Sequence, residues 1–367
     1  MSIYWNEKTK RLKPYVAGEQ PRDRKYIKLN TNENPYPPSP AVIDAINRAA
    51  CDTLRLYPDP ACTELRETVA AQYGINAGQV FPGNGSDEVL AFAFAAFFGT
   101  VPDKDTVLFP DITYSFYPVY AGLWDIPFKT IPVEEDFSID PKAYLGDSGG
   151  IVLSNPNAPT GMALNSGELE KIAEAAQRNR RVLIVDEAYI AFAGGEGVGT
   201  VLPLIKEYPN VLIVRTLSKE ASLAGIRAGF AIGAEELVEG LCRIRDSFNS
   251  YTMDRLALAG AVAAIKDSSY YDEINSKVIA TRGRVSSALK AMGFRVLPSQ
   301  ANFIFASPPE SGGINGQAFF TALRDRGILV RHFNKPRIAD FLRISMGTDK
   351  EMDTFLEVCG EILARVR

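Results

Sequence analysis

Lys219 stands where a lysine side chain can do chemistry. It follows the apolar run Val211 to Val214, which predicts a buried strand of a parallel sheet. Open α/β sheets bind ligands at the carboxyl ends of such strands. Ser218 precedes the lysine, and a small-residue turn at Ala224-Gly225 and then Arg227 follow it. A partly desolvated amine beside a hydroxyl and a guanidinium suits a Schiff-base cofactor that carries a phosphate. Taken alone, a lysine in this position is more often a solvated strand end.

Two further segments contain side chains or backbone groups that such a site needs. Asp186 ends the apolar run 182–185, and a buried carboxylate needs a partner. If it lies beside Lys219, both belong to one site at the edge of the sheet; a helix N-cap is the alternative. Small residues at 82–88 precede the helical run 89–98, whose first backbone N–H groups can hold an anion. A plain capped helix start is the alternative there.

The elements around these residues alternate between strands and helices, which predicts an α/β fold. After Gly293 the pattern changes to short strands around one helix at 316–326, with a last helix at 349–367. We therefore predict an N-terminal arm over residues 1–28, a large domain over 29–270 and a small C-terminal domain over 271–367 that begins with a linking helix.

Composition and charge exclude several classes of protein. The chain has 367 residues, of which 46% are hydrophobic and 23% charged, as in soluble globular proteins. Its net charge of −4 argues against a nucleic-acid surface. Four scattered cysteines and one histidine, His332, show no metal-ligand or redox spacing, so we predict no metal site. The first 16 residues lack the apolar core of a signal peptide or membrane span. We expect a cytoplasmic protein with no membrane or nucleic-acid partner.

Four motifs occur in the order found in fold-type I pyridoxal-phosphate aminotransferases. They are Asn-Pro-Asn-Ala-Pro-Thr-Gly (155–161), Asp-Glu-Ala-Tyr (186–189), Thr-Leu-Ser-Lys followed by Leu-Ala-Gly-Ile-Arg-Ala-Gly (216–229), and Phe-Leu-Arg-Ile-Ser-Met-Gly-Thr (341–348). With Asn-Glu-Asn-Pro (32–35) and Gly-Asn-Gly-Ser-Asp-Glu (83–88), the set most closely resembles the histidinol-phosphate aminotransferase family. The resemblance runs from about Leu29 to the C-terminus. It implies a large domain with a mostly parallel seven-stranded sheet between helices, a smaller α+β C-terminal domain, and pyridoxal 5'-phosphate as cofactor.

The resemblance assigns roles around the cofactor's ring. Lys219 would form the Schiff base and later move the proton between the substrate and the cofactor. Asp186 would pair with the pyridine nitrogen and keep it protonated, which makes the ring an electron sink. Tyr189 would bind the phenolic oxygen, and Tyr114 would stack on the ring.

The resemblance also assigns the residues that bind anions. Arg343 matches the arginine that grips a substrate carboxylate by a bidentate fork. Arg331 matches a position that helps to bind the substrate phosphate, with a surface arginine as the alternative. Asn32 and Asn302 are expected to line the pocket. The cofactor phosphate would be held by Gly85, Ser86, Asp87, Ser218 and Arg227, and by Tyr57 of the neighbouring subunit, which implies a homodimer with shared active sites.

Two positions depart from the family pattern. Ala158 stands where the family usually has the asparagine whose amide meets the phenolic oxygen. We expect Asn157, one residue earlier, to make this contact. Glu220 follows Lys219, where relatives often carry small or aromatic residues. This carboxylate either alters the basicity of Lys219 or faces solvent.

The resemblance predicts an enzyme of histidine biosynthesis. It would transfer the amino group of L-histidinol phosphate to 2-oxoglutarate, giving imidazole-acetol phosphate and glutamate. An aromatic amino-acid aminotransferase or a threonine-phosphate decarboxylase of the same family would share nearly every residue named above. A non-catalytic cofactor-binding regulator is a more remote alternative, since such proteins usually add a DNA-binding domain.

Overall fold

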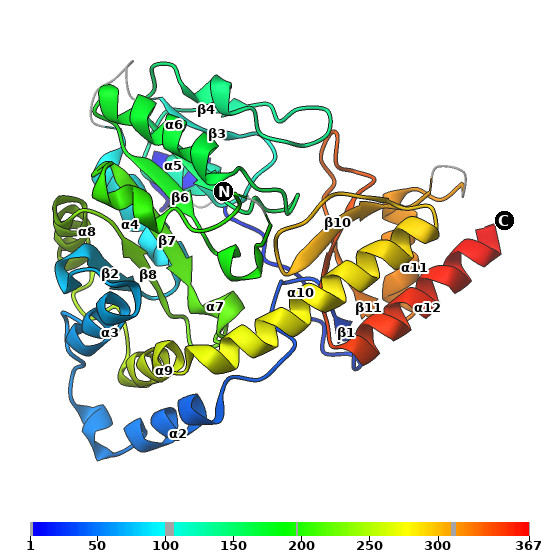
Figure 1. The fold of residues 1–367 in the computed structure, drawn as a ribbon, viewed down its shortest axis with the longest axis horizontal. Coiled ribbons are helices and arrows are strands. Elements are labelled where there is room, and N and C mark those ends of the chain that lie inside the picture. The colour runs from blue at the N-terminus through cyan, green and yellow to red at the C-terminus, as the bar shows by residue number, and fades with distance from the viewer. Residues whose placement is uncertain (1–2, 100–105, 196, 310–312, 367) are drawn as a thin grey trace.

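A seven-stranded sheet lies at the centre of the larger domain (Figure 1). The computed structural model describes residues 3–99, 106–195, 197–309 and 313–366. The strand order is β2-β8-β7-β6-β5-β3-β4. β8 is antiparallel to both of its neighbours, and the other pairs are parallel. The predicted α/β fold with a mostly parallel sheet is confirmed. The strands are β2 (Val80–Gly83), β3 (Val107–Pro110), β4 (Phe128–Ile131), β5 (Gly150–Ser154), β6 (Leu183–Asp186), β7 (Val211–Thr216) and β8 (Gly229–Ile232).

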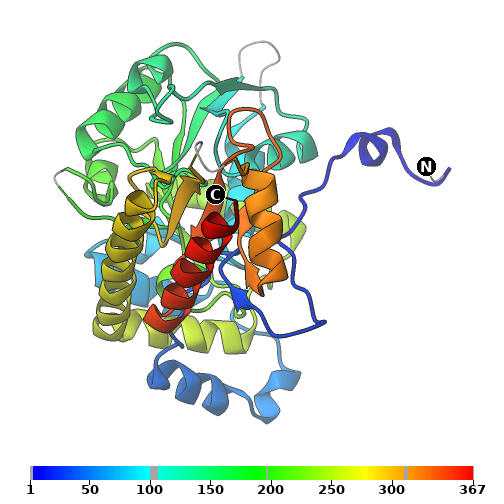
Figure 2. The same cartoon turned by 90° about the vertical axis from the view of Figure 1, so that its right-hand side faces the viewer.

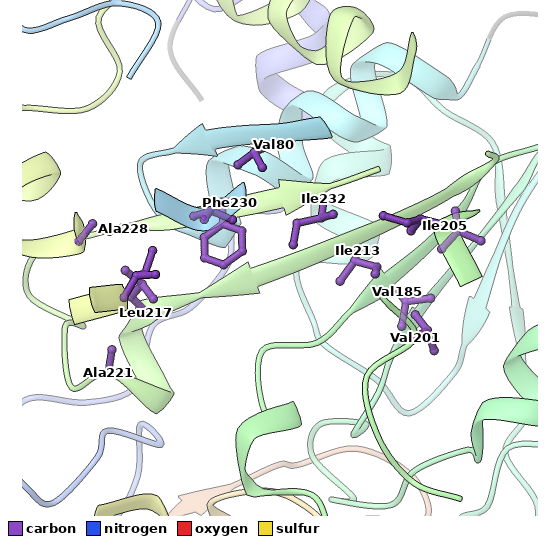
Figure 3. Close-up of a cluster of buried hydrophobic side chains, with 14 of the residues drawn as sticks. Val80, Val185, Val201, Ile205, Ile213, Leu217, Ala221, Ala228, Phe230 and Ile232 are labelled. Atoms are coloured by element: carbon purple, nitrogen blue, oxygen red, sulfur yellow. The ribbon is translucent and has the colours of Figure 1, made fainter. Parts of the chain in front are cut away.

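Each face of the sheet packs into its own hydrophobic core. Successive strand residues point to opposite faces, so Leu183 and Val185 of β6 enter one core and Ile184 enters the other. Figure 3 shows part of the first core, with Ile213 of β7 and Phe230 of β8 among its side chains. Helices α3 (Thr63–Tyr73), α6 (Ser166–Arg178) and α9 (Arg255–Lys266) contribute to the first core, and α2 (Pro40–Ala49) packs on α9. Helices α4 (Ser86–Phe97), α5 (Tyr117–Leu123) and α8 (Glu235–Phe248) contribute to the second.

Helix α10 (Ser268–Ala291) connects the large sheet to a smaller α+β unit (Figure 1). Its residue Ile274 packs in the first core, whereas Val285 and Leu289 pack in a separate core at the C-terminal end. That unit has an antiparallel sheet in the order β12 (Arg331–His332), β13 (Leu342–Ser345), β10 (Phe303–Ser307) and β9 (Arg295–Val296), with helices α11 (Gly316–Asp325) and α12 (Asp349–Val366). The domain limits at 28/29 and 270/271 remain a prediction. Within the described ranges, no helix is long and apolar enough to cross a membrane.

The segment before residue 29 is only in part the extended arm that we expected. It contains a short helix, α1 (Glu7–Arg11), which projects at the edge of the molecule in Figure 2 and is held to the end of α5 by ion pairs of Lys8 and Arg11 with Asp125. It also contains β1 (Ile27–Lys28), which pairs in parallel with β11 (Ile328–Leu329) of the C-terminal unit. Leu29, the next residue, is buried in the core of that unit. The N-terminal segment is therefore integrated into the C-terminal unit by backbone pairing and apolar burial.

Short 3₁₀ turns complete the described structure. They lie at Asp52–Arg55, Ala77–Gln79, Pro141–Tyr144, Ile190–Phe192 and Leu202–Lys206.

Candidate active site

A cavity opens where the large sheet, the C-terminal unit and the N-terminal segment meet. Its walls include the ends of β6 and β7, where Asp186 and Lys219 stand. Most of the predicted site residues line this one cavity: Asn32, Ser86, Asp87, Tyr114, Asp186, Tyr189, Ser218, Lys219, Arg227, Arg331 and Arg343.

Lys219 lies in the short helix α7 (Leu217–Glu220), directly after β7. Its Nζ donates a hydrogen bond to the backbone oxygen of Thr31 at 3.0 Å. Desolvation, together with the nearby Arg343 guanidinium, lowers the pKa of Lys219 from 10.5 to about 8. The amine is therefore much more readily neutral, and so nucleophilic, than an ordinary lysine.

Asp186 ends β6 and is almost fully buried. Tyr117 donates its hydroxyl to Oδ2 at 3.0 Å, and the backbone amide of Ala188 donates to Oδ1 at 3.2 Å. Burial raises the pKa of Asp186 from 3.8 to about 7, although both hydrogen bonds favour the ionised form. Such a carboxylate can exchange or share a proton near neutral pH with a basic nitrogen placed beside it.

The start of α4 forms a cradle for an anion. Gly85 precedes the helix with φ of 80°, and no described side chain caps the first turn. The side chain of Arg227 reaches this turn, with Nη2 3.0 Å from Asp87 Oδ2 and Nη1 3.5 Å from Ser218 Oγ. A Cβ on Gly229 would lie 2.6 Å from the Ser86 nitrogen, so the turn packs tightly on β8. Uncapped amides, a hydroxyl and a guanidinium together suit a phosphate.

Arg343 projects from β13 between two aromatic rings. Its guanidinium carbon lies 5.5 Å from the centroid of Phe303 and 5.6 Å from that of Phe333. Nη2 donates to the backbone oxygen of Asn30 at 3.1 Å, while Nε is buried and has no hydrogen-bond partner among the residues that the structure describes. A buried donor without a partner is costly, so this side chain is arranged for an acceptor that a ligand brings.

Arg331 and the N-terminal segment form the wall of the cavity near Arg343. Arg331 donates to the backbone oxygens of Val16 at 3.2 Å and Ala17 at 3.4 Å. Tyr15, next in the chain, lines the cavity and stacks on Phe116 with ring centroids 4.3 Å apart. Our sequence analysis missed Tyr15, because a single aromatic residue in a polar segment with prolines carries no periodic signal.

Tyr114 and Tyr189 also line the cavity. Tyr114 donates its hydroxyl to Asp87 at 2.7 Å. Tyr189 accepts a hydrogen bond from the Asn32 amide at 3.0 Å. Asn302 does not line the cavity. Its amide donates to the Asn32 backbone oxygen at 3.0 Å and so helps to position Asn32.

Asn157 does not replace the missing asparagine, contrary to our expectation. Its side-chain oxygen accepts from Thr113, and its amide donates to Ile112 and Thr160, so the surrounding loop satisfies the whole group. Ala158 lines the cavity instead. The contact with the phenolic oxygen that we predicted for Asn157 is therefore not supported.

Two other predicted residues lie outside the cavity wall. Gly85 directly precedes Ser86 at the helix start, and it does not line the cavity. Tyr57 is 76% exposed and stacks on Tyr251, with ring centroids 4.5 Å apart.

Glu220 does not simply face solvent: burial raises its pKa, and the nearby Arg215 opposes this shift.

The cavity attracts negatively charged ligands. Four cationic side chains line it, Lys219, Arg227, Arg331 and Arg343, against the two carboxylates of Asp87 and Asp186. A wall with this excess of positive charge favours a ligand with several negative charges. In the part of the chain that the structure describes, no cluster of histidine, cysteine, aspartate or glutamate is arranged to hold a metal ion.

Comparison with known proteins identifies the family. Residues 24–358 match the family described as aminotransferase class I and II. The chain belongs to this family. A histidinol-phosphate aminotransferase from Clostridium acetobutylicum is 53% identical over 364 residues, which are 99% of this chain and 100% of the relative. Another from Clostridium beijerinckii is 48% identical over 99% of this chain and 98% of the relative. The fold is also similar to that of solved structures. One is the crystal structure of histidinol-phosphate aminotransferase from Sinorhizobium meliloti in complex with pyridoxal-5'-phosphate. It matches with a TM-score of 0.88 and 25% identity, over 100% of this chain and 99% of that one.

The cofactor of this aminotransferase is pyridoxal 5'-phosphate, and the cavity fits it. The amine of Lys219 has the lowered pKa that attack on an aldehyde needs. The Asp186 carboxylate suits a pyridine nitrogen, and the start of α4 with Arg227 suits the phosphate.

Proposed function

We propose that this aminotransferase transfers the amino group of L-histidinol phosphate to 2-oxoglutarate, giving imidazole-acetol phosphate and glutamate in histidine biosynthesis. The observation that carries the proposal is Arg343, which lines the same cavity as Lys219 and whose buried Nε has no hydrogen-bond partner among the described residues. It offers a hydrogen bond to an anionic substrate that reaches the lysine. The full-length similarity to histidinol-phosphate aminotransferases supports this choice of substrate.

The reaction needs a base at the substrate's α-carbon. When bound, pyridoxal 5'-phosphate supplies an aldehyde for the amino group and a ring that accepts electron density. Lys219 would hold the cofactor, and its neutral amine would take the proton from the substrate α-carbon and then give it up to the cofactor. Asp186 keeps a proton on the ring nitrogen, and Tyr114 and Tyr189 orient the ring. Ser218, Arg227 and the amides of 85–87 hold the cofactor phosphate.

The two substrates present different anions to the same pocket. L-histidinol phosphate brings a phosphate, and 2-oxoglutarate brings carboxylates. Arg343 forms a fork that fits either group, and Arg331 stands at the cavity wall near it. Asn32 also lines the cavity, and its amide donates a hydrogen bond that holds the hydroxyl of Tyr189 in place.

A single-turnover experiment tests the substrate. Cofactor-loaded protein is mixed with L-histidinol phosphate, and the visible absorption band of the cofactor is followed. Rapid loss of the band with formation of the amino form of the cofactor is the expected result. Conversion only with phenylalanine, or release of carbon dioxide from threonine phosphate, would replace the substrate and retain the family and the cofactor.

We also propose a cytoplasmic homodimer with shared active sites, in which Tyr57 contacts the cofactor phosphate of the partner. Exposed apolar side chains near Tyr57 support an interface between two copies: Leu54, Leu56, Phe248 and Tyr251. The four cysteines are free thiols, as expected in a reducing compartment.

Mixed dimers test the shared site. Lys219→Ala and Tyr57→Ala are each expected to be nearly inactive alone. If Tyr57 contacts the cofactor in the partner's cavity, a dimer of one Lys219→Ala subunit and one Tyr57→Ala subunit has one site with both changes and one intact site. Mixing the two variants and letting the subunits reassociate then restores activity. If each cavity uses its own Tyr57, every site in the mixture carries a defect, and no activity returns.

A further inference from the structure

We propose that Tyr117 is a positioning residue that keeps Asp186 ionised and fixes its carboxylate at the cavity. Tyr117 does not line the cavity, so it acts through Asp186 and not on a ligand. The inference rests on the proposed function only in that the ring nitrogen of the cofactor lies at Asp186.

The geometry holds the Tyr117 hydroxyl in one place. Tyr117 is fully buried at the start of α5, and its ring packs against Phe109 and Phe94 of the second core at centroid distances of 5.8 and 6.3 Å. Its hydroxyl lies 3.0 Å from Asp186 Oδ2. Because the ring cannot move without opening the core, the hydrogen bond is preorganised.

The two hydrogen bonds fix the carboxylate plane. Tyr117 donates to Oδ2, and the backbone amide of Ala188 donates to Oδ1. Each oxygen has one donor and retains a further lone pair. Asp186 is thereby held in one rotation, with acceptor capacity left for a ring nitrogen in the cavity that it lines.

The Tyr117 hydroxyl opposes the surroundings that raise the pKa of Asp186. Burial raises the pKa of Asp186 most, and the neighbouring carboxylates Asp87 and Glu187 raise it further. The hydrogen bond from Tyr117 is the foremost influence that lowers it, followed by the Ala188 amide. Without the hydroxyl, the carboxyl group takes up a proton more readily. A neutral carboxyl group would no longer stabilise a protonated ring nitrogen, so the ring would attract electrons less.

The test compares two tyrosine-to-phenylalanine variants of α5 in the full-length protein. Tyr117→Phe removes the hydroxyl that bonds to Asp186. Tyr120→Phe is the matched control, because Tyr120 is also buried in α5, and among the described residues no hydrogen bond joins its hydroxyl to Asp186. Dissociation constants are measured for pyridoxal 5'-phosphate and for an analogue with a carbon atom in place of the ring nitrogen.

We expect Tyr117→Phe to weaken binding of pyridoxal 5'-phosphate by about 10-fold or more, the scale of a lost hydrogen bond to a charged group. Binding of the carbon analogue should stay close to that of the unchanged protein, and Tyr120→Phe should alter neither. Equal weakening for both ligands would mean that Tyr117 only supports packing, and would overturn the proposal. So would equal effects of the two variants.

The pH profile of the half-reaction gives a second readout. In Tyr117→Phe the acid limb of the rate should move upward by about one pH unit or more, since Asp186 stays protonated to higher pH. An unmoved limb would count against the proposal. L-glutamate is used as amino donor in parallel with L-histidinol phosphate. If L-histidinol phosphate fails to react while the shift appears with glutamate, the proposed substrate is wrong and the role of Tyr117 stands.

Discussion

The amine of Lys219 lies 3.0 Å from the backbone oxygen of Thr31, so the reactive lysine bonds to a neutral carbonyl and not to an acidic side chain. A carboxylate partner would have stabilised the ammonium form and raised the pKa. Desolvation instead lowers it to about 8.

The rate of cofactor attachment should therefore depend on pH with a midpoint near 8. Below this pH the amine of Lys219 is protonated and cannot attack an aldehyde; above it the neutral amine predominates. Stopped-flow mixing of apo-protein with pyridoxal 5'-phosphate at a series of pH values measures the midpoint. Arg343→Met should move it upward, because it removes a cation that lowers the lysine pKa. A midpoint near 10.5 in the unchanged protein would contradict the assignment.

Arg343→Lys should reduce kcat/KM for L-glutamate by about 10- to 100-fold. A lysine keeps the charge but loses the planar fork and the unpartnered Nε donor. Half-reaction kinetics at several glutamate concentrations measure the change. Arg337→Lys is the matched control, because Arg337 bonds to the Glu134 backbone oxygen and does not line the cavity. Similar losses in both variants would argue against Arg343 as the anion-binding group.

The buried ion pair between Glu187 and Arg215 is predicted to stabilise the ends of β6 and β7. Arg215 Nη2 lies 2.8 Å from Glu187 Oε2, and both side chains are nearly inaccessible. Glu187→Gln removes the carboxylate that is hydrogen-bonded to the buried Arg215 guanidinium, so the free energy of unfolding should fall by about 3 kcal/mol. Urea denaturation measures it.

Glu239→Gln provides the control for this ion pair. Glu239 pairs with Arg243 on the surface of α8, where both side chains are mostly exposed. Its loss should cost only about 0.5 kcal/mol. Equal losses of stability in the two variants would refute the distinction.

Gly229→Ala should weaken cofactor binding through the backbone. The added Cβ would lie within 3 Å of the Ser86 nitrogen and the Arg215 oxygen, so the turn before α4 must shift away from β8. We expect at least a tenfold rise in the cofactor dissociation constant, in line with the loss of one or more hydrogen bonds to phosphate. Gly225→Ala has open space around the new Cβ and should bind normally. Normal binding by Gly229→Ala would show that the turn does not need this close approach.

The sequence predicted the central strands and the groups that stand at their ends. Apolar runs such as 182–185 and 211–214 are predicted to form buried strands; Asp186 follows the first directly, and Lys219 follows the second after four residues. The reversed direction of β8 was not predicted: in the structure, only the four-residue helix α7 lies between β7 and β8, and the two strands pair antiparallel.

Other parts of the site depend on contacts that no local pattern encodes. Asn157 looked free to reach a ligand, but its hydrogen bonds to Ile112 and Thr160 are set by how the loop closes. Tyr15 lies at the cavity through contacts that are distant in sequence: Arg331 binds the backbone beside it, and its ring stacks on Phe116. A buried tyrosine such as Tyr117 cannot be distinguished by sequence from one that merely fills a core.

The parallel pair of Ile27 with Ile328 joins two segments that lie nearly the whole chain apart. A ribosome releases the first of these residues long before the second exists, so during synthesis β1 must wait unpaired. Pairings of such long sequence separation form late, because loop closure costs entropy before the contact is gained. The C-terminal unit, and with it the wall of the cavity that carries Arg331 and Arg343, can be completed only after nearly all of the chain has been made.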